Sequence, residues 1–178
     1  MNIKKGVWTI LVLALLFCSG LVVFSILRPM NQTTGETAPS TDVVLGTPLQ
    51  VAAPTRKIGD LSELPQGAVS HVDVVYFHRT ERCTSCLNAE SYTRETVEKY
   101  FADQVQRGRM SFQVYDVEKA ANAALARKFD AAGSSLYLGV LIEGAEYLCP
   151  IQDVWLYITN KYLFIAKLKE KLASLMES

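Results

Sequence analysis

The sequence has little of what a nucleic-acid-binding or zinc-binding protein needs. Its 178 residues contain 18 basic and 18 acidic side chains, so the formal net charge is zero and no basic surface for nucleic acid is expected. It contains only two histidines and four cysteines, without the repeated ligand pairs of most zinc-binding domains. Proline is also scarce beyond Gly67, where only Pro150 remains. These absences favour an ordinary globular domain over either of those classes.

What the sequence does contain is one long apolar run, residues 6–27, without a charged side chain. At about 1.5 Å per residue this run would span roughly 30 Å as a helix, which matches the hydrocarbon core of a bilayer. Lys4 and Lys5 precede it and only Arg28 follows closely, so the positive-inside rule predicts residues 1–5 in the cytoplasm. We therefore expect a transmembrane signal anchor that crosses the membrane lipid bilayer once. The rest of the chain would lie on the extracytoplasmic side, periplasmic or extracellular.

Two other interpretations of this run are a cleaved signal peptide and a lipoprotein signal that ends at Cys18. A lipoprotein signal needs a small residue before its cysteine, and Phe17 is bulky. A cleaved signal has a shorter apolar core followed by polar sequence, whereas residues 21–27 continue the apolar run. An uncleaved anchor fits the sequence best.

Composition divides the remainder of the chain into two parts. Residues 28–68 are rich in Thr, Pro, Gly and Ala, with few aromatic side chains and no sustained apolar period. Such a segment buries too little apolar surface to offset the entropy of ordering it, so it is expected to be a flexible linker. A short strand near residues 43–51 is an alternative. Residues 69–178 are long enough for one compact core and are expected to form the working domain.

Apolar periodicity in this domain predicts alternating strands and helices. The expected elements, in order, are a strand at 71–77, a helix from 83 to about 107 ended by Gly108, a strand at 112–115, a helix capped by Asp116 and ended by Gly133, strands at 136–142 and 147–149, and a last helix capped by Asp153. The turn at 143–146 makes the last two strands a hairpin, and a break of the last helix is expected near Asn160. This β-α-β-α-β-β-α order predicts an α/β fold whose first two strands are parallel.

Helix-spaced apolar side chains are expected to face the core of this domain. In the first helix these include Tyr100 and Phe101, and in the second Phe129. The last helix repeats apolar residues at steps of three and four, at Val154, Ile158, Tyr162, Ile165, Leu168, Leu172 and Leu175. Cys149 ends an apolar strand and is expected to be a small buried hydrophobic residue.

A Cys-x-x-Cys pair, Cys83 and Cys86, directly follows the first strand and opens the first helix. Two cysteines at this spacing in a first helical turn can close a small disulfide. The free amide groups and the positive end of the helix dipole favour a thiolate at Cys83, and Arg82 and Arg79 add positive charge nearby. Cys83 is therefore predicted to be the more acidic and more exposed thiol, which attacks a disulfide. Cys86 is predicted to resolve the mixed disulfide.

His78, at the end of the first strand, is a candidate to carry a proton to or from the pair. The alternative is a histidine that is only hydrogen-bonded at a strand end. The cysteine pair has two other interpretations: a structural disulfide, to which so small a loop adds little stability, and a structural zinc site. A zinc ion would need four converging ligands, for which the chain offers Cys83, Cys86, Cys149 and His78.

The element order and the place of the Cys-x-x-Cys pair resemble the thioredoxin superfamily over residues 69–178. The segment VVYFHRTERCTSCLNAE is more narrowly similar to the nitrophenyl-compound nitroreductase F-subunit family, which is linked to arsenic-resistance gene clusters of bacteria. The match rests on Tyr76, Phe77, His78, Thr80, Arg82, Cys83 and Cys86. The resemblance implies a thioredoxin-like three-layer fold and a redox subunit that helps partners to reduce nitroaromatic or arsenical compounds. The chain shows no flavin, heme or nicotinamide motif, so no cofactor is expected and the final reduction would belong to a partner.

Three differences from thioredoxins themselves narrow the range of clients that is expected. The cis-proline before the third strand is replaced by the Gly-Ser-Ser of residues 133–135, the tryptophan before the first cysteine by Arg82, and the Gly-Pro between the cysteines by Thr84 and Ser85. A dedicated protein redox partner or client disulfide is therefore favoured over a broad range of clients. Two further hypotheses stay open. One is a module whose thiols bind a soft metal or metalloid ion, arsenite or copper(I), without turnover, and the other is a scaffold whose cysteines are incidental.

Overall fold

The structure is a computed structural model that describes residues 44–48 and 54–177. Among these residues, no helix is both long and apolar enough to cross a membrane. The predicted anchor at residues 6–27 and the first part of the predicted linker lie outside the described residues. Both therefore stay predictions.

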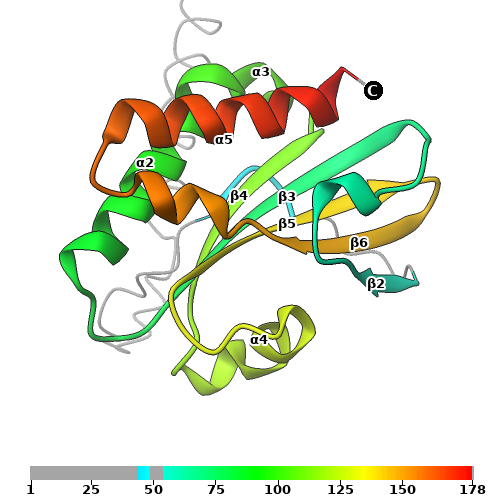
Figure 1. Ribbon diagram of the computed structural model, residues 1–178. Helices are drawn as coiled ribbons and strands as arrows, with labels where there is room; N and C mark the ends of the chain where they lie inside the picture. The colour runs from blue at the N-terminus through cyan, green and yellow to red at the C-terminus, as the bar shows by residue number, and fades with distance from the viewer. Residues whose placement is uncertain (1–43, 49–53, 178) are drawn as a thin grey trace, which may run out of the picture. The chain divides into compact units, whose positions relative to one another are not determined.

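A six-stranded mixed sheet forms the centre of the domain, in the order β1-β4-β3-β5-β6-β2 (Figure 1). Its strands are β1 (Val44–Leu45), β2 (Thr55–Lys57), β3 (Val69–His78), β4 (Met110–Asp116), β5 (Ser135–Ile142) and β6 (Ala145–Pro150). β3 is central, and it pairs in parallel with β4 and antiparallel with β5. β5 and β6 form the predicted hairpin, and the turn between them holds Gly144 at φ 78°, a conformation that glycine adopts without strain.

Helices cover both faces of this sheet. The α-helices of the described residues are α2 (Thr84–Tyr100), α3 (Ala102–Gln106), α4 (Ala123–Phe129) and α5 (Lys161–Met176). Three short 3-10 helices are η1 (Leu61–Glu63), η2 (Ala120–Asn122) and η3 (Asp153–Tyr157). α2 and α5 lie on one face and α4 lies on the other (Figure 1). The mixed α/β class expected from the sequence is confirmed.

Side chains that alternate along β3 contribute to a core on each face of the sheet. Val72, Val74 and Tyr76 pack into the larger core, under α2 and α5. Val75 and Phe77 point to the opposite face, where the ring of Phe77 lies 5.4 Å from the ring of Phe129 in α4. Burial on both faces explains why four successive residues of this strand, 74–77, are all apolar.

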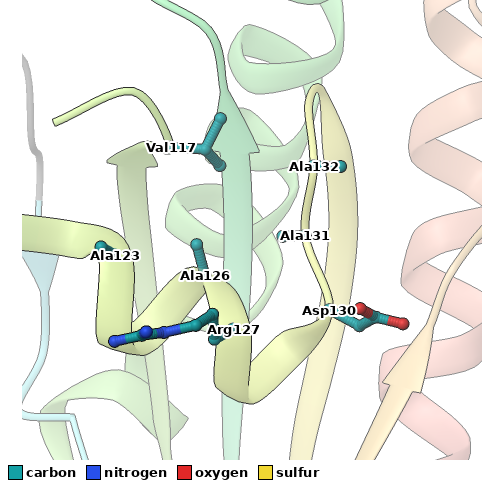
Figure 2. Close-up of a pocket in the computed structure, with 7 residues that line it drawn as sticks. All are labelled: Val117, Ala123, Ala126, Arg127, Asp130, Ala131 and Ala132. Carbon is teal, nitrogen blue, oxygen red and sulfur yellow. The ribbon is translucent and has the colours of Figure 1, made fainter. Parts of the chain in front are cut away.

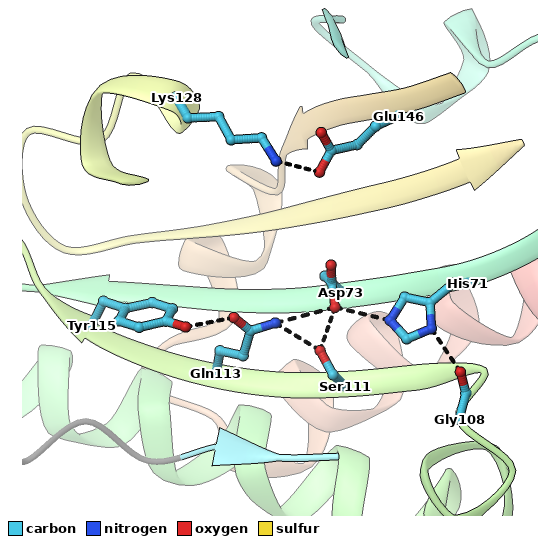
Figure 3. Close-up of polar contacts among 8 residues, drawn as sticks. All are labelled: His71, Asp73, Gly108, Ser111, Gln113, Tyr115, Lys128 and Glu146. Atoms are coloured by element: carbon cyan, nitrogen blue, oxygen red, sulfur yellow. Dashed lines mark hydrogen bonds and ion pairs between the residues drawn. The ribbon is translucent and has the colours of Figure 1, made fainter. Parts of the chain in front are cut away.

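A chain of hydrogen bonds crosses β3 and β4 on the α4 face of the sheet (Figure 3). It joins His71, Asp73, Ser111, Gln113 and Tyr115. Asp73 is at its centre, since its carboxylate accepts from His71 Nε2 at 2.9 Å and from Gln113 Nε2 at 3.1 Å. His71 Nδ1 lies 2.7 Å from the carbonyl oxygen of Gly108. Burial lowers the pKa of His71, but the hydrogen bond and charge of Asp73, with this carbonyl, raise it above its ordinary value.

Two aromatic residues that the helical pattern placed in the core are exposed instead. Tyr100 is 39% exposed, because α2 ends there and the chain turns at Phe101 before α3 begins. That turn buries Phe101, as predicted, and leaves the Tyr100 ring beside the ammonium group of Lys169. Tyr162 is 84% exposed, because α5 starts only at Lys161 and has its own helical phase. The helical phase of the apolar pattern therefore does not carry across the break near Asn160.

Neither aspartate predicted as a helix cap performs that role. Asp116 ends β4, and its carboxylate accepts from the Thr80 hydroxyl at 2.8 Å and from the Glu118 amide at 2.9 Å, so it ties two loops together. Asp153 lies in η3 and forms an ion pair with Lys171 at 2.9 Å. The residue that caps α5 is Asn160, whose side chain accepts from the Leu163 amide at 3.2 Å.

Part of the segment expected to be a linker carries regular structure. Strand β2 pairs in parallel with β6 at one edge of the sheet, with Arg56 opposite Tyr147. The following η1 helix is closed by reciprocal hydrogen bonds between Asp60 and Glu63. β1, within the segment 43–51 where a strand was the alternative, pairs with β4 at the other edge. Strands of two or three residues are too short to show an apolar period, and their hydrogen bonds come from edges of the sheet.

Candidate redox site at the start of helix α2

Cys83 and Cys86 form a disulfide where β3 gives way to α2. Their Cα atoms are 5.1 Å apart. Cys83 is the N-cap residue of α2, with extended backbone angles, and its sulfur accepts from the backbone amide of Cys86 at 3.3 Å. Cys83 is exposed and Cys86 is half-buried, which confirms the predicted difference in exposure between the two thiols. A nucleophile from outside therefore reaches the sulfur of Cys83 first.

The two arginines expected to make the site electropositive are both ion-paired. The guanidinium of Arg82 is 2.5 Å from a carboxylate oxygen of Glu90, and Arg94 lies 2.7 Å from the other oxygen. Arg79 lies on the surface, with its Nε 3.0 Å from a carboxylate oxygen of Glu118. Glu90 carries one negative charge against the two guanidinium groups of Arg82 and Arg94, so the positive charge beside Cys83 is only partly offset and adds to the effect of the amide groups at the start of α2.

Glu90 is the residue that pairs with Arg82, and it was not among the residues predicted for the site. Its carboxylate is held between Arg82 and Arg94 on the inner side of α2. Burial raises the pKa of Glu90, but the hydrogen bonds and charges of Arg94 and Arg82 outweigh burial and bring it below its ordinary value. The spacing of four residues between Glu90 and Arg94 is visible in the sequence, whereas the reach of Arg82 over two helical turns is not.

Tyr76, on the α2 side of β3, contacts the backbone of Cys86. Its side chain is 0% exposed, and its hydroxyl donates to the backbone carbonyl of Cys86 at 2.8 Å. The guanidinium of Arg82 lies 5.9 Å from the centre of its ring. In the sequence, Tyr76 appears only as one residue of an apolar strand and of the family motif.

His78 lies two residues further along the same face of β3, and only 1% of it is exposed. Its ring centre is 6.5 Å from that of Tyr76. Nδ1 lies 2.8 Å from the carbonyl oxygen of Arg79, which accepts only, so Nδ1 carries a proton. Nε2 is buried and has no hydrogen-bond partner among the described residues. In the neutral ring, Nε2 therefore carries the lone pair.

The loop before β5 lies near Tyr76. Ser134 precedes the first residue of β5, and its side chain acts to lower the pKa of Tyr76. The Ser135 hydroxyl donates to the carbonyl of Gly133 at 3.0 Å. No cis peptide bond occurs in the described residues, this loop included. The loop at residues 133–135 thus acts on the tyrosine that contacts the backbone of Cys86.

Comparisons with known proteins add no family. No protein-family model matches the chain, and no curated protein matches it. A solved structure described as "Structure of a malarial protein" is similar at 20% identity, over 55% of this chain and 96% of that chain, with a TM-score of 0.34. A similarity of that size carries no argument, so the site is interpreted from its own geometry.

The remaining cysteine of the described residues is not part of the site. Cys149 is fully buried in the core on the α5 side of the sheet, as predicted. Burial raises its pKa to about 11. Across residues 44–48 and 54–177, no group of three or more His, Cys, Asp or Glu side chains is arranged to hold a metal ion. The four-ligand zinc site considered from the sequence therefore finds no support.

A shallow pocket of about 310 Å³ lies beside α4 and is separate from the cysteines (Figure 2). It is lined by Val117, Ala123, Ala126, Arg127, Asp130, Ala131 and Ala132. Most of these side chains are single methyl groups, and none is a thiol or an imidazole. The pocket offers no chemistry that would add to the dithiol.

Proposed function

We propose that this chain is a thiol/disulfide redox protein with a thioredoxin-like domain. The observation that carries the proposal is the Cys83–Cys86 disulfide at the start of α2, with Cys83 as its exposed end. So small a loop contributes little to stability, which argues against a purely structural bond. An exposed sulfur at a helix N-terminus is suited to reversible exchange.

The sheet topology supports the thioredoxin-like part of the proposal. The four longest strands lie in the order β4-β3-β5-β6, with β3 and β4 parallel and the rest antiparallel. α2 connects the parallel strands on one face, α4 leads to β5 on the other, and α5 returns to the first face. This is the arrangement implied by the resemblance of residues 69–178 to that superfamily.

The proposed reaction is a two-electron exchange. In the reducing direction, the Cys83 thiolate attacks one sulfur of a client disulfide, forms a mixed disulfide and releases the other client sulfur as a thiolate. Cys86 then loses its proton and attacks the Cys83 sulfur. The Cys83–Cys86 disulfide forms, and the second client sulfur leaves. Two electrons pass to the client, whose two thiolates take up protons from Cys86 and from solvent; oxidation of a client dithiol is the reverse.

His78 is proposed to take the proton of Cys86 in the second step. It is buried on the same face of β3 as Tyr76, which contacts Cys86, and its Nε2 has a free lone pair. A His78→Asn variant keeps an N–H donor for the Arg79 carbonyl and removes Nε2. It should release the mixed disulfide more slowly while Cys83 reacts at the normal rate.

The resemblance to the nitroreductase F-subunit family suggests a client within a system that reduces nitroaromatic or arsenical compounds. The apolar run at residues 6–27 suggests that the domain is anchored to a membrane and works outside the cytoplasm. Separation of cell membranes by sedimentation, with carbonate extraction, tests the anchor. Release of the chain by carbonate would contradict it.

Trapping of a mixed disulfide tests the proposed reaction. A Cys86→Ser variant cannot resolve the intermediate, so Cys83 should stay joined to its client and the complex should be reducible by dithiothreitol. A Cys83→Ser variant, which keeps the half-buried thiol, is the matched control and should trap far less. Equal trapping by both variants, or no adduct with either in cells that make the protein, would contradict the proposal.

Capture of a soft ion by the reduced pair is a second candidate. It is favoured by the exposed Cys83 sulfur and by serine in place of proline at residue 134. Two thiolates suit arsenite or copper(I). Titration of the reduced protein should then show binding much tighter than that of free dithiothreitol, and equal affinity would remove this candidate.

A further inference from the structure

Tyr76 contacts the Cys-x-x-Cys segment at both of its ends. Its ring lies under the guanidinium of Arg82, the residue directly before Cys83. Its hydroxyl donates to the backbone carbonyl of Cys86. Tyr76, fully buried in the central strand, therefore contacts both the side chain of Arg82 and the backbone of Cys86.

The same hydroxyl also joins the loop before β5. Its single proton is donated to the Cys86 carbonyl, and the Ser134 side chain acts on the phenol oxygen, since it lowers the pKa of Tyr76. Burial raises the pKa of Tyr76, while the Ser134 hydrogen bond and the charge of Arg82 act in the opposite direction. The phenol therefore keeps its proton at neutral pH and remains a donor.

The hydrogen bond from Tyr76 fixes Cys86, the residue whose amide contacts the Cys83 sulfur. The amide of Cys86 donates to the sulfur of Cys83 at 3.3 Å. The carbonyl that Tyr76 holds belongs to the same residue, so fixing it restricts the rotation of Cys86 and keeps its amide directed at Cys83. An N–H donor favours the thiolate over the thiol.

We infer that Tyr76 is a positioning residue for the dithiol, which stabilises the reduced state by fixing the first turn of α2. This inference rests on the proposed redox function. Its consequence is measurable in the exchange with glutathione. There, the Cys83–Cys86 disulfide and two glutathione thiols give the dithiol and glutathione disulfide, with two electrons transferred. Stabilising the Cys83 thiolate shifts that equilibrium towards the dithiol.

Tyr76→Phe is the direct test, because it removes the hydroxyl and keeps the ring under Arg82. One neutral hydrogen bond is worth about a fivefold change in an equilibrium constant. The variant of the full chain should therefore show about fivefold less dithiol relative to disulfide in glutathione buffers. Its reduced Cys83 should also react more slowly with iodoacetamide at neutral pH, which a loss of stability alone would not cause.

Tyr137→Phe is the matched control. Tyr137 is also buried, but it lies on the opposite face of the sheet, and its hydroxyl donates to the carbonyl of Asp130, at 3.4 Å. It should leave both readouts unchanged. If Tyr76→Phe folds with a normal circular dichroism spectrum and an unchanged equilibrium, the inference is wrong.

Ser134→Ala covers the case in which Tyr76→Phe does not fold. Ser134 lies in a half-exposed loop, so its loss is tolerated more easily. It should shift the same equilibrium in the same direction by about twofold, since the hydroxyl of Tyr76 keeps its main bond. No shift in that variant would overturn the inference. A wild-type protein without a reversible disulfide would instead refute the proposed function itself.

Discussion

Replacement of Asp73 should destabilise the protein strongly, and more at low pH than at high pH. The Asp73 carboxylate accepts hydrogen bonds from His71, Ser111 and Gln113 on the α4 face of the sheet (Figure 3). All three donors are buried. Gln113 keeps a bond to Ser111 when the carboxylate is removed, so two donors are left without a partner on that side.

The magnitude follows from those two donors. Each buried donor without a partner costs about 1–3 kcal/mol, and breaking a buried ion pair costs about 3–5 kcal/mol. Asp73→Ala should therefore lower the free energy of unfolding by about 4 kcal/mol, a large part of the total for a domain of this size. Asp73→Asn keeps an acceptor of the same shape and loses the charge, so about 2 kcal/mol is expected.

The sign of the pH dependence comes from His71. Its pKa in the folded protein is raised above the ordinary value of 6.5, because Asp73 and the Gly108 carbonyl outweigh burial. The resulting stabilisation is complete below the pKa of the unfolded chain and is lost as the pH rises through the folded pKa. The difference in stability between wild type and Asp73→Asn should therefore be largest near about pH 5 and should shrink towards about pH 9.

Urea unfolding followed by far-ultraviolet circular dichroism at several pH values measures this difference. Lys128→Met is the control, because its ion pair with Glu146 at 2.7 Å lies on the same face but is partly exposed. It should cost less than about 1 kcal/mol, with no change between neutral and mildly alkaline pH. A difference for Asp73→Asn that is constant or grows with pH would refute a charged His71 in the folded protein.

The remaining predictions concern Glu90, Cys149 and Asn160. Glu90→Gln removes the negative charge that pairs with Arg82, so the Cys83 thiolate should be favoured. Reduced Cys83 should then be alkylated faster than in wild type. An unchanged rate would show that Glu90 does not offset the charge of Arg82. The pKa of Glu90 is lowered in the folded protein, so its ion pairs stabilise the fold at pH values above 4.5, the ordinary pKa of a glutamate. This contribution to the free energy of unfolding should fade as the pH falls below that value. Cys149 should resist alkylation in the native protein at neutral pH, since burial raises its pKa to about 11; peptide mass spectrometry with and without urea checks this. Asn160→Ala should lower stability by about 1 kcal/mol through loss of the α5 cap, while Asn160→Asp should retain most of it in thermal unfolding.

Much of the sheet could be predicted because its strands carry strong local patterns. Residues 74–77 of β3 and most of β5 are apolar on both faces, and the turn at Gly144 separates two strands of a hairpin, so their type and order follow from neighbouring residues. Helix limits were less predictable. Asp116 has the chemistry of a cap, but its carboxylate is taken by Thr80, which is 36 residues away in the sequence.

The cysteine pair was found from its spacing and its place after a strand, but its surroundings were not. Arg82 was expected to act as a free positive charge, and in the folded protein it is paired with Glu90. Tyr76 had no predicted role, and its hydroxyl reaches the carbonyl of Cys86. These contacts depend on the way α2 packs on β3, which no local pattern encodes.

The sequence by itself determined the class of the domain, the order of its main strands and helices, and the position of Cys83 and Cys86 at a helix start. It could do so because apolar periodicity and a two-residue spacing are local properties of the chain. Only the tertiary structure decided which charges are paired, which aromatic residues are exposed, and which side chain contacts the backbone of Cys86. Those outcomes depend on side chains brought together from separate elements, such as Tyr76 and Ser134, which are distant in sequence and adjacent in space.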